Sequence, residues 1–579
     1  MAGMWTPLNN QPTFFASTMV LLTDGTILCH DAGSGAVGTP NWYKFTPDAM
    51  GSYINGSWSP VAAGPNSPQF YASAVLRDGR VFVAGGEYNG STTPAELLAA
   101  EIYDPVANTW TPLATPAGWT QIGDAICCVF PDGRVLVGPS GETEKRTAIY
   151  DPVANSWTAA ANKIGPASSE ESWVLLPDQT ILTCNCFGHP AAEKYVIASN
   201  KWVNAGPTAS DLIEDSSHEI GPGVLLADGR VLFVGSTGRT NLYTLPPVSN
   251  QPGSWAAGPT LPVQGGQQLI AKDAPGCLLP NGKVLLAASP AGGCPVIDEG
   301  YCPPTFFFEF DPSNDSLNPA PAPANSGNAV FNGRMLMTPS GQVLFTDGSQ
   351  HVEAYTPDGV PDAFLKPQIT NAPAAVSPGF TYTLHGRQIN GVSQCSMYGD
   401  DATMATNYPI VTLRSGGGNV VFCRAHHFST MGVATGNVVH STRFTVPAGT
   451  PLGVYTLCVT ANGISSDCQT VNVTTKIFKD LKWEIKEIKD KEIIKENLKA
   501  EIDVVKSLES DIPKLKDNEG DPWKQFQGDP AWVQVMQTLI KRSDLVQEVL
   551  LKRAFIQPEE RPAVGEEPLK SGGETKKKD

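Results

Sequence analysis

The sequence predicts a mainly β protein. We expect a seven-bladed β-propeller, then an immunoglobulin-like β-sandwich, then a C-terminal α-helical, coiled-coil-like segment. Three observations predict this order. The 579 residues include 56 Gly and 49 Pro, and only 17% are charged, which is typical of a turn-rich β protein. A hairpin pattern recurs seven times, and the composition changes near Thr475.

The repeated unit is an apolar run, a turn dipeptide and a second apolar run, as in "SAVLRDGRVFVAGG". The turn dipeptides begin at Asp24, Asp78, Asp132, Asp178, Asp228, Asn281 and Ser340. The spacings between them are 54, 54, 46, 50, 53 and 59 residues, which fits a propeller blade of four strands. Asp-Gly between apolar runs favours a type I′ hairpin, because both central residues then need a positive φ.

Two further strands follow the hairpins, as in "YDPVANTW" (103–110) and "YDPVANSW" (150–157). We expect their aromatic side chains to fill the space between neighbouring blades. The last unit has a third strand in "HVEAYTPDG" but no fourth. The N-terminal "MWTPL" (4–8) copies "TWTPL" (109–113), so residues 1–361 are predicted to form a ring closed by the N-terminal strand.

The chain after the ring divides into three parts. Residues 362–474 show short alternating strands with a turn signal about every ten residues, which predicts the sandwich. Residues 475–557 place apolar side chains at three- and four-residue steps, which is typical of an amphipathic helix that needs a partner. We expect a module for self-association or for docking on a scaffold; the alternative is an intramolecular helical hairpin. Residues 558–579 are predicted to be disordered.

Charge and hydropathy exclude two classes of partner. Residues 475–579 hold 21 Lys and Arg against 22 Asp and Glu, which leaves 19 and 35 for residues 1–474. The body is therefore acidic, near −16, and phosphate backbones would be repelled, so nucleic acid is not expected. No apolar run is long enough for a transmembrane helix. "MAGMWTPLNN" lacks the pattern of a signal peptide. We expect an extracellular or particle- or surface-displayed protein without a recognisable leader.

The kelch-like units, the sandwich after them and the loop "CRAHHFSTMGVATG" together resemble the galactose oxidase and glyoxal oxidase family over residues 1–474. The resemblance implies oxidation of alcohols or aldehydes by one copper ion and a tyrosyl radical. It also implies a Tyr cross-linked to a Cys, a Tyr-His pair that opens a late blade, and a His from the sandwich.

Matching the family's residues one at a time indicates that most are missing. The cross-linked Tyr falls on Phe70, or on Tyr71 after a shift of one residue, and no Cys lies in Phe14–Met19 to partner it. The aromatic residue that stacks over the site falls on Tyr88. The Tyr-His pair falls on Phe331 and Asn332, and the last ligand on His426 or His427. Phe has no hydroxyl for copper or a radical, so the resemblance implies loss of the oxidase site.

Two further clusters carry titratable side chains. In "EDSSHEIGPG", Glu214, Asp215, His218 and Glu219 enter an inner strand, where they could bind a ligand or exchange protons, or could simply cap turns. "CNCFGH" gives Cys184, Cys186 and His189, which could bind a metal, although a thiol cluster or a disulfide fits the spacing better. Cys294 with Cys302 and Cys458 with Cys468 suit disulfides, which form in oxidising compartments.

The sequence therefore predicts a non-catalytic recognition or adhesion protein, with no cofactor, whose ring binds a glycan or a protein and whose helical tail anchors it. The alternative is a copper-dependent oxidase with a rearranged site, in which His426 and His427 are weak candidates for metal ligands. If the family's geometry is kept, the loop that carries these two His reaches the channel beside Phe70. The alternative is a polar loop that packs the sandwich on the ring. The candidate ligand-binding residues are Phe70, Tyr71, Tyr88, His218, Glu219, Phe331, Asn332, His426 and His427.

Overall fold

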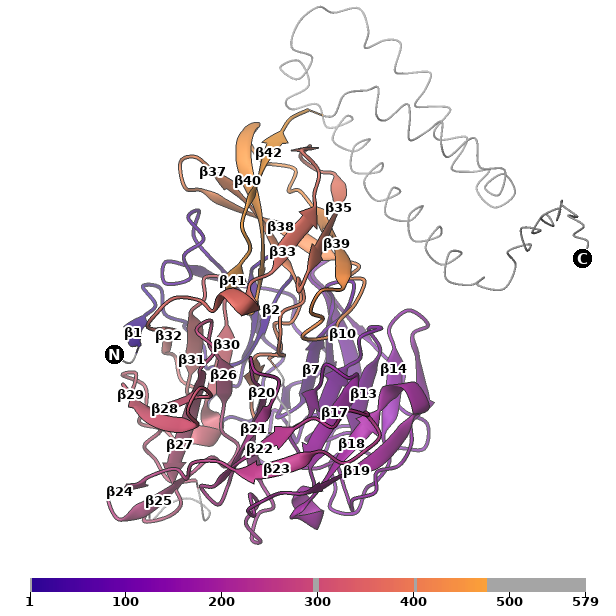
Figure 1. Ribbon diagram of the computed structural model, residues 1–579, viewed down its shortest axis with the longest axis vertical. Coiled ribbons are helices and arrows are strands. Elements are labelled where there is room, and N and C mark those ends of the chain that lie inside the picture. The colour runs from indigo at the N-terminus through magenta and orange to yellow at the C-terminus, as the bar shows by residue number, and fades with distance from the viewer. Residues whose placement is uncertain (1–2, 295–300, 400–403, 476–579) are drawn as a thin grey trace, which may run out of the picture. The chain divides into compact units, whose positions relative to one another are not determined.

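A computed structural model describes residues 3–294, 301–399 and 404–475 of the chain (Figure 1). These residues are almost entirely β, and no α-helix lies among them. Four short 3-10 helices occur: η1 (Cys186–Gly188), η2 (Ile197–Ser199), η3 (Val330–Asn332) and η4 (Ala363–Leu365). No helix within this part of the chain is long and apolar enough to cross a membrane. The predicted helical segment and disordered end, residues 475–579, lie outside the described residues apart from Thr475.

Six four-stranded antiparallel sheets form a propeller-like ring. The first three are β2 (Ala16–Leu21), β3 (Ile27–Asp31), β4 (Trp42–Thr46) and β5 (Ser57–Pro60); β7 (Ala72–Val75), β8 (Val81–Ala84), β10 (Ala100–Asp104) and β11 (Thr109–Pro112); and β12 (Ile126–Val129), β13 (Val135–Gly138), β14 (Ala148–Asp151) and β15 (Ser156–Ala159). The other three are β16 (Val174–Leu175), β17 (Thr180–Cys184), β18 (Ala191–Val196) and β19 (Lys201–Pro207); β20 (Ile220–Leu225), β21 (Val231–Gly235), β22 (Thr240–Thr244) and β23 (Ser254–Ala257); and β30 (Arg334–Met337), β31 (Val343–Thr346), β32 (Val352–Thr356) and β1 (Met4–Pro7).

The sixth predicted repeat departs from this plan. Its strands β26 (Gly276–Leu278), β27 (Val284–Pro290), β28 (Phe306–Asp311) and β29 (Ser316–Ala320) belong to a seven-stranded sheet, together with β24 (Val263–Gln264), β25 (Gln267–Ile270) and β36 (Ser396–Met397). The prediction of seven like blades is therefore corrected to six four-stranded blades and one enlarged sheet. The extra strands arise because β27 is seven residues long and pairs with β25 beyond the end of β26.

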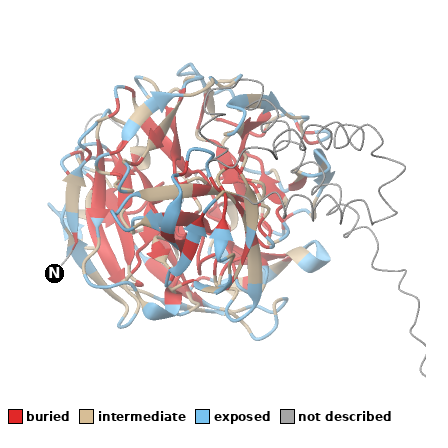
Figure 2. Ribbon diagram, turned by 90° about the horizontal axis from the view of Figure 1, so that it is seen from above, coloured by how far each residue is buried: buried red, intermediate tan, exposed pale blue. Residues whose placement is uncertain are grey.

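The innermost strands contact one another around a closed ring, in the order β2, β7, β12, β16, β20, β26, β30 and back to β2. The innermost strands and the strands beside them are mostly buried, whereas the outermost strands and many loops are exposed (Figure 2). The N-terminal strand closes the last blade: Met4–Pro7 pairs in antiparallel register with Thr356–Glu353, as the comparison of "MWTPL" with "TWTPL" predicts.

The hairpin turns differ in type from the prediction. In the first blade the N–H of Gly25 bonds to the carbonyl of Leu22, and Leu22 N–H bonds to the carbonyl of Thr26. Gly25 has φ of 76°, but Asp24 is not among the residues with positive φ. This is a type I turn followed by a left-handed residue, so the loop has three residues and not the two of a type I′ hairpin. Asp24 instead accepts a hydrogen bond from the N–H of Thr26.

Tryptophan side chains link successive sheets around the ring. In each linked pair, an indole Nε1–H on an outer strand donates to a backbone carbonyl at the outer edge of the preceding sheet. The pairs are Trp5 to Pro321, Trp58 to Asn10, Trp110 to Ala62, Trp157 to Ala114, Trp202 to Ala161 and Trp255 to Ala205, at 2.6–3.1 Å. These bonds add specificity to the predicted aromatic packing between blades.

Residues after the ring form one continuous curled sheet, which corrects the predicted two-sheet sandwich. Its strands are β33 (Gln368–Asn371), β34 (Ala375–Val376), β35 (Thr381–Arg387), β37 (Ile410–Ser415), β38 (Val420–His426), β39 (Val439–Thr445), β40 (Gly453–Ala461), β41 (Ile464–Ser465) and β42 (Gln469–Val473). β38 pairs on one side with β37 and on the other with β39, and this pairing joins the two halves.

Both predicted disulfides, Cys294–Cys302 and Cys458–Cys468, are present.

Candidate functional site at the entry to the inner strands

The residues before four inner strands lie at one end of the ring. Phe70 precedes β7, Glu219 precedes β20, Asp273 lies just before β26, and Phe331 lies just before β30. A two-stranded ladder of β6 (Pro68–Gln69) with β9 (Tyr88–Asn89) brings Tyr88 beside Phe70. Phe70 has φ of 54°, an uncommon value for a residue with a side chain, and such values cluster at functional sites.

A buried guanidinium joins the aromatic residues of this site. Arg334, the first residue of β30, is only 1% exposed. Its Cζ lies 3.7 Å from the ring centre of Tyr398 and 5.8 Å from that of Phe70. Its Nη1 donates to the carbonyl of Phe331 at 2.7 Å, and the Tyr398 hydroxyl donates to the same carbonyl at 2.7 Å. The Phe70 and Tyr88 rings meet edge to face, with centres 6.1 Å apart.

Charged side chains form the neighbouring half of the site around Tyr301. The Tyr301 hydroxyl lies 3.0 Å from Glu219 Oε1 and 2.5 Å from Asp273 Oδ2. Lys272 Nζ lies 4.1 Å above the Tyr301 ring, and that ring meets Phe331 edge to face at 5.0 Å. Burial and the charges of Asp273 and Glu219 raise the pKa of Tyr301, so its hydroxyl stays protonated.

Two comparisons found no match, since neither a protein-family model nor a curated protein matches the chain. Among solved structures, one similar chain is a fungal alcohol oxidase of the AA5 family in complex with copper. It is 16% identical with a TM-score of 0.47, and the match covers 82% of this chain and 99% of that one. Another is YjhT, also 16% identical, with a TM-score of 0.34, 54% of this chain covered and 99% of that one. Neither likeness assigns an activity to this protein.

Other predicted site residues lie apart from this group. Tyr71 is buried and turned towards the first blade, with its ring centre 5.4 Å from His30 and 6.0 Å from Trp42. The Asn332 side chain lies beside Gly348 of its own blade. Phe70, Tyr88, Glu219 and Phe331 are therefore the predicted residues that the structure brings together.

His218 belongs to a separate polar cluster. Its ring centre lies 4.5 Å from Phe187 and 6.1 Å from His189. His189 in turn faces Asp211 at 2.9 Å and Asp215 at 3.2 Å. Glu214 accepts hydrogen bonds from the hydroxyls of Ser216 and Ser217. It therefore caps a turn, which is the role that the sequence offered as the alternative to ligand binding.

The cysteines of "CNCFGH" lie in the buried core around β17. Cys184 and Cys186 are both buried and not disulfide-bonded. The Cys186 thiol donates to the carbonyl of Glu170 at 2.9 Å. Among residues 3–294, 301–399 and 404–475, no three His, Cys, Asp or Glu side chains are grouped so that they could hold a metal ion.

His426 and His427 lie where the curled sheet packs on the hairpin turns of the ring. Phe428 N–H donates to the carbonyl of Arg77, and Ala425 N–H to that of Thr23. Arg77 follows the C-terminal end of β7, whereas Phe70 precedes its N-terminal end, so the His pair lies at the other end of this strand from Phe70. The two Nδ1 atoms are 2.6 Å apart, and His426 Nε2 lies 3.0 Å from Thr445 Oγ1.

We predict that His426 makes stability pH-dependent. Burial, then the charges of Arg424, His427 and Arg443, lower the pKa of His426 to about 2. Below pH ~6.5 the unfolded chain binds a proton at this residue and the folded chain does not, so stability is lost as the pH falls, by about 1.4 kcal/mol per pH unit. His426→Gln should flatten the dependence of the free energy of unfolding between pH 6.5 and 5. An unchanged slope in urea titrations would contradict this role.

Sequence reasoning missed Arg334, Tyr398, Tyr301, Lys272 and Asp273. Arg334 had a signal, because a charged residue opens an otherwise apolar inner strand in "GRMLMT". Lys272 and Asp273 in "AKDAPG" also precede an inner strand, at the place that Glu219 holds in the preceding blade. Tyr398 had none, because its place depends on a segment after the ring that reaches back to β26.

Proposed function

We propose that the ring is a non-catalytic recognition module that binds a carbohydrate at the site around Phe70, Tyr88, Tyr301 and Phe331. The buried guanidinium of Arg334 is the observation that carries this proposal. The family resemblance would put copper ligands at Phe70, Phe331 and Asn332. In place of the first two ligands lie two hydrocarbon rings beside a permanent cation, and the Asn332 amide is turned towards Gly348 instead. A guanidinium stays protonated and repels a second cation at short range in a low-dielectric site. This side-chain set does not fit a copper ion.

The remaining side chains suit a sugar. Phe70, Tyr88, Tyr301 and Phe331 are all partly exposed, so part of each side chain can contact the apolar C–H face of a pyranose. Glu219 lies on the same side and can accept hydrogen bonds from sugar hydroxyls. Burial, then the nearby carboxylate of Glu87, raises the pKa of Tyr88 to about 12, so its hydroxyl remains a donor at neutral pH. A few polar groups among aromatic rings are typical of a small-ligand site.

The test is a glycan-array screen of the full-length protein, followed by titration of the best ligand. Tyr88→Ala should weaken binding at least about fivefold, because a ring at the centre of a contact contributes about 1 kcal/mol or more. Phe364→Ala is the matched control, because it also removes an aromatic ring but far from the site. Phe364 is 91% exposed and lies in η4. The residue before η4, Asp362, donates its N–H to the carbonyl of Pro280, which places η4 at the hairpin end of the ring.

Two outcomes would contradict the proposal. One is an array on which no glycan is retained above background. The other is a titration in which Tyr88→Ala binds as tightly as the wild-type protein. If the site binds a protein segment and no glycan, the protein still has a recognition function, but the proposal that its ligand is a carbohydrate is overturned. The predicted role of residues 475–557 as an anchor remains a prediction from sequence.

A further inference from the structure

A segment after the ring runs back among the inner strands. β36 pairs antiparallel with β26, so that Cys277 faces Ser396 and Gly276 faces Met397. Leu175 N–H donates to Gln394 Oε1 at 2.9 Å, and Met337 N–H donates to Ser396 Oγ at 3.1 Å. The segment is therefore bonded to the inner strands of three different sheets, although it lies more than 100 residues beyond β26 in sequence.

Two thiols meet where this segment crosses β26. Cys277 Sγ lies 3.9 Å from Cys395 Sγ, and both residues are 0% exposed. Leu278 N–H donates to the carbonyl of Cys395 at 2.9 Å, which fixes the two backbones side by side. Cys395 has φ of 84°, a conformation that a residue with a side chain rarely adopts. Backbone hydrogen bonds thus hold the sulfur atoms less than 2 Å from bonding distance, which is about 2.05 Å.

We propose that Cys277 and Cys395 form a third disulfide, which cross-links the ring to the segment that carries Tyr398. The oxidant is a low-molecular-weight disulfide. The two thiols give up two protons and two electrons, one S–S bond forms between them, and the oxidant's S–S bond is reduced to two thiols. Cys294–Cys302 and Cys458–Cys468 already require an oxidising compartment, so no further condition is needed.

The bond forms while the chain folds. Burial, then the neighbouring Cys395, raises the pKa of the Cys277 thiol well above its usual value, so the thiolate that attacks a disulfide is scarce once the core has closed. The cross-link then holds the segment three residues before Tyr398, whose ring covers Arg334 and whose hydroxyl bonds to Phe331. It would fix one wall of the candidate site, whether the ligand there is a carbohydrate or not.

Differential alkylation of the full-length protein tests the proposal. The protein is refolded with oxidised and reduced glutathione, denatured with iodoacetamide, then reduced and treated with N-ethylmaleimide before peptide mapping. Cys277 and Cys395 should carry the second label, N-ethylmaleimide, as should the four cysteines of the other disulfides; the first label is the iodoacetamide adduct of free thiols. Cys29 and Cys423, which are buried and not disulfide-bonded, should carry the first label and serve as internal controls. A non-reduced digest should contain a peptide pair that joins Cys277 to Cys395.

The proposal is overturned if Cys277 and Cys395 carry the first label while the other two disulfides are intact. Cys395→Ser supplies a second readout, because it should move Cys277 to the first label and lower the denaturation midpoint under oxidising conditions. With reductant present, the difference between this variant and the wild-type protein should shrink. A Cys395→Ser protein that does not fold leaves the wild-type map as the deciding result.

Discussion

Deleting residues 1–10 is expected to destabilise the ring by about 3–5 kcal/mol or more, the cost of removing a packed Trp side chain alone. Met4–Pro7 forms the outer strand of the last blade, beside β32, so its loss leaves one edge of β32 unpaired. Trp5 packs against Tyr355, with ring centres 4.9 Å apart, and against Phe307 at 5.3 Å. Its indole N–H also donates to the carbonyl of Pro321, which directly follows β29 of the enlarged sheet. Thermal and urea unfolding, followed by tryptophan fluorescence, measure the loss.

Two point variants separate the strand from its side chains. Trp5→Ala should reproduce most of the loss, whereas Met4→Ala should have little effect, because Met4 is on the same strand but 65% exposed. A truncated protein that unfolds at the same midpoint as the full-length chain would contradict closure of the ring by this strand.

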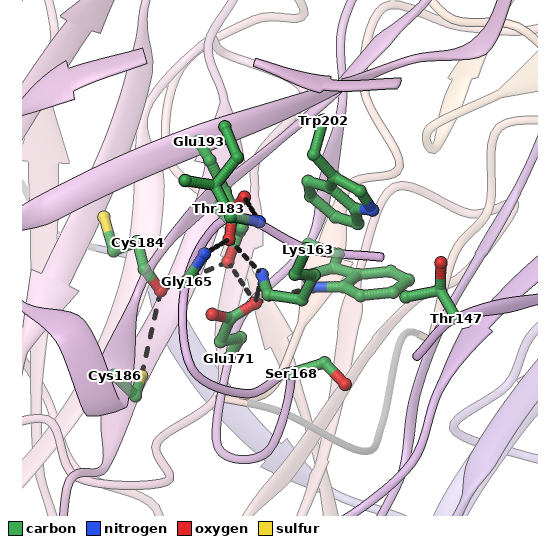
Figure 3. A network of polar contacts seen from close by, with 12 residues as sticks. Thr147, Lys163, Gly165, Ser168, Glu171, Thr183, Cys184, Cys186, Glu193 and Trp202 are labelled. Atoms are coloured by element: carbon green, nitrogen blue, oxygen red, sulfur yellow. Dashed lines mark hydrogen bonds and ion pairs between the residues drawn. The ribbon is translucent and has the colours of Figure 1, made fainter. Parts of the chain in front are cut away.

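The second large effect is expected from Lys163→Met. Lys163 Nζ lies 2.6 Å from Glu171 Oε2 and 2.8 Å from Glu193 Oε1, and all three side chains are inaccessible to solvent or nearly so (Figure 3). The ammonium also lies 4.3 Å from the centre of the Trp202 ring. Removing one member of a buried ion pair leaves uncompensated charge and costs about 3–5 kcal/mol. Urea titration at neutral pH measures this loss.

The loss from Lys163→Met should depend on pH. Burial is the largest influence on Glu171, and its pKa is raised to about 7 even with Lys163 present. Without the ammonium, the folded state holds a proton on Glu171 to a higher pH than the unfolded state does. Stability should therefore fall as the pH rises from about 5 to 8, and the variant should lose less at pH 5.

A triple variant is the matched control for this buried network. Lys163→Met combined with Glu171→Gln and Glu193→Gln removes all three charges, and it should be more stable than Lys163→Met alone at pH 8. A loss under 1 kcal/mol for the single variant, or an equal loss at pH 5 and pH 8, would contradict the account of this network.

Local patterns in the sequence predict the ring well. Three features recur from blade to blade: the spacing of the hairpins, the aromatic third and fourth strands, and the outer-strand motif that "MWTPL" copies. Features that recur can be recognised as a period in the sequence. The turn type was wrong because Asp24 bonds its side chain to Thr26 N–H, which stabilises a type I turn that sequence alone did not distinguish. The sandwich was wrong because pairing of β38 with both β37 and β39 is a long-range event without a local signature.

Only some of the residues of the candidate site could be predicted from the sequence. Phe70, Tyr88 and Phe331 were found by matching the family's residues onto the repeats, and Glu219 because it lies at the entry to an inner strand. Tyr301 lies between β27 and β28, away from the repeated strands, and Tyr398 follows β36 beyond the ring; they reach the site through tertiary contacts with Asp273 and Arg334. The family resemblance implied a ligand role for His426 or His427, but the fold places this pair at the hairpin end of β7.

Copper loading is the most direct test of the central claim that the oxidase chemistry is replaced by a recognition site. The full-length protein is incubated with excess Cu(II), dialysed, and measured for bound metal and for the absorption and electron paramagnetic resonance of a tyrosyl radical. We predict substoichiometric copper, no radical signal and no hydrogen peroxide from alcohols or aldehydes, because Arg334 lies among the side chains that would have to hold the metal. One tightly bound copper per chain together with a tyrosyl radical would contradict the account.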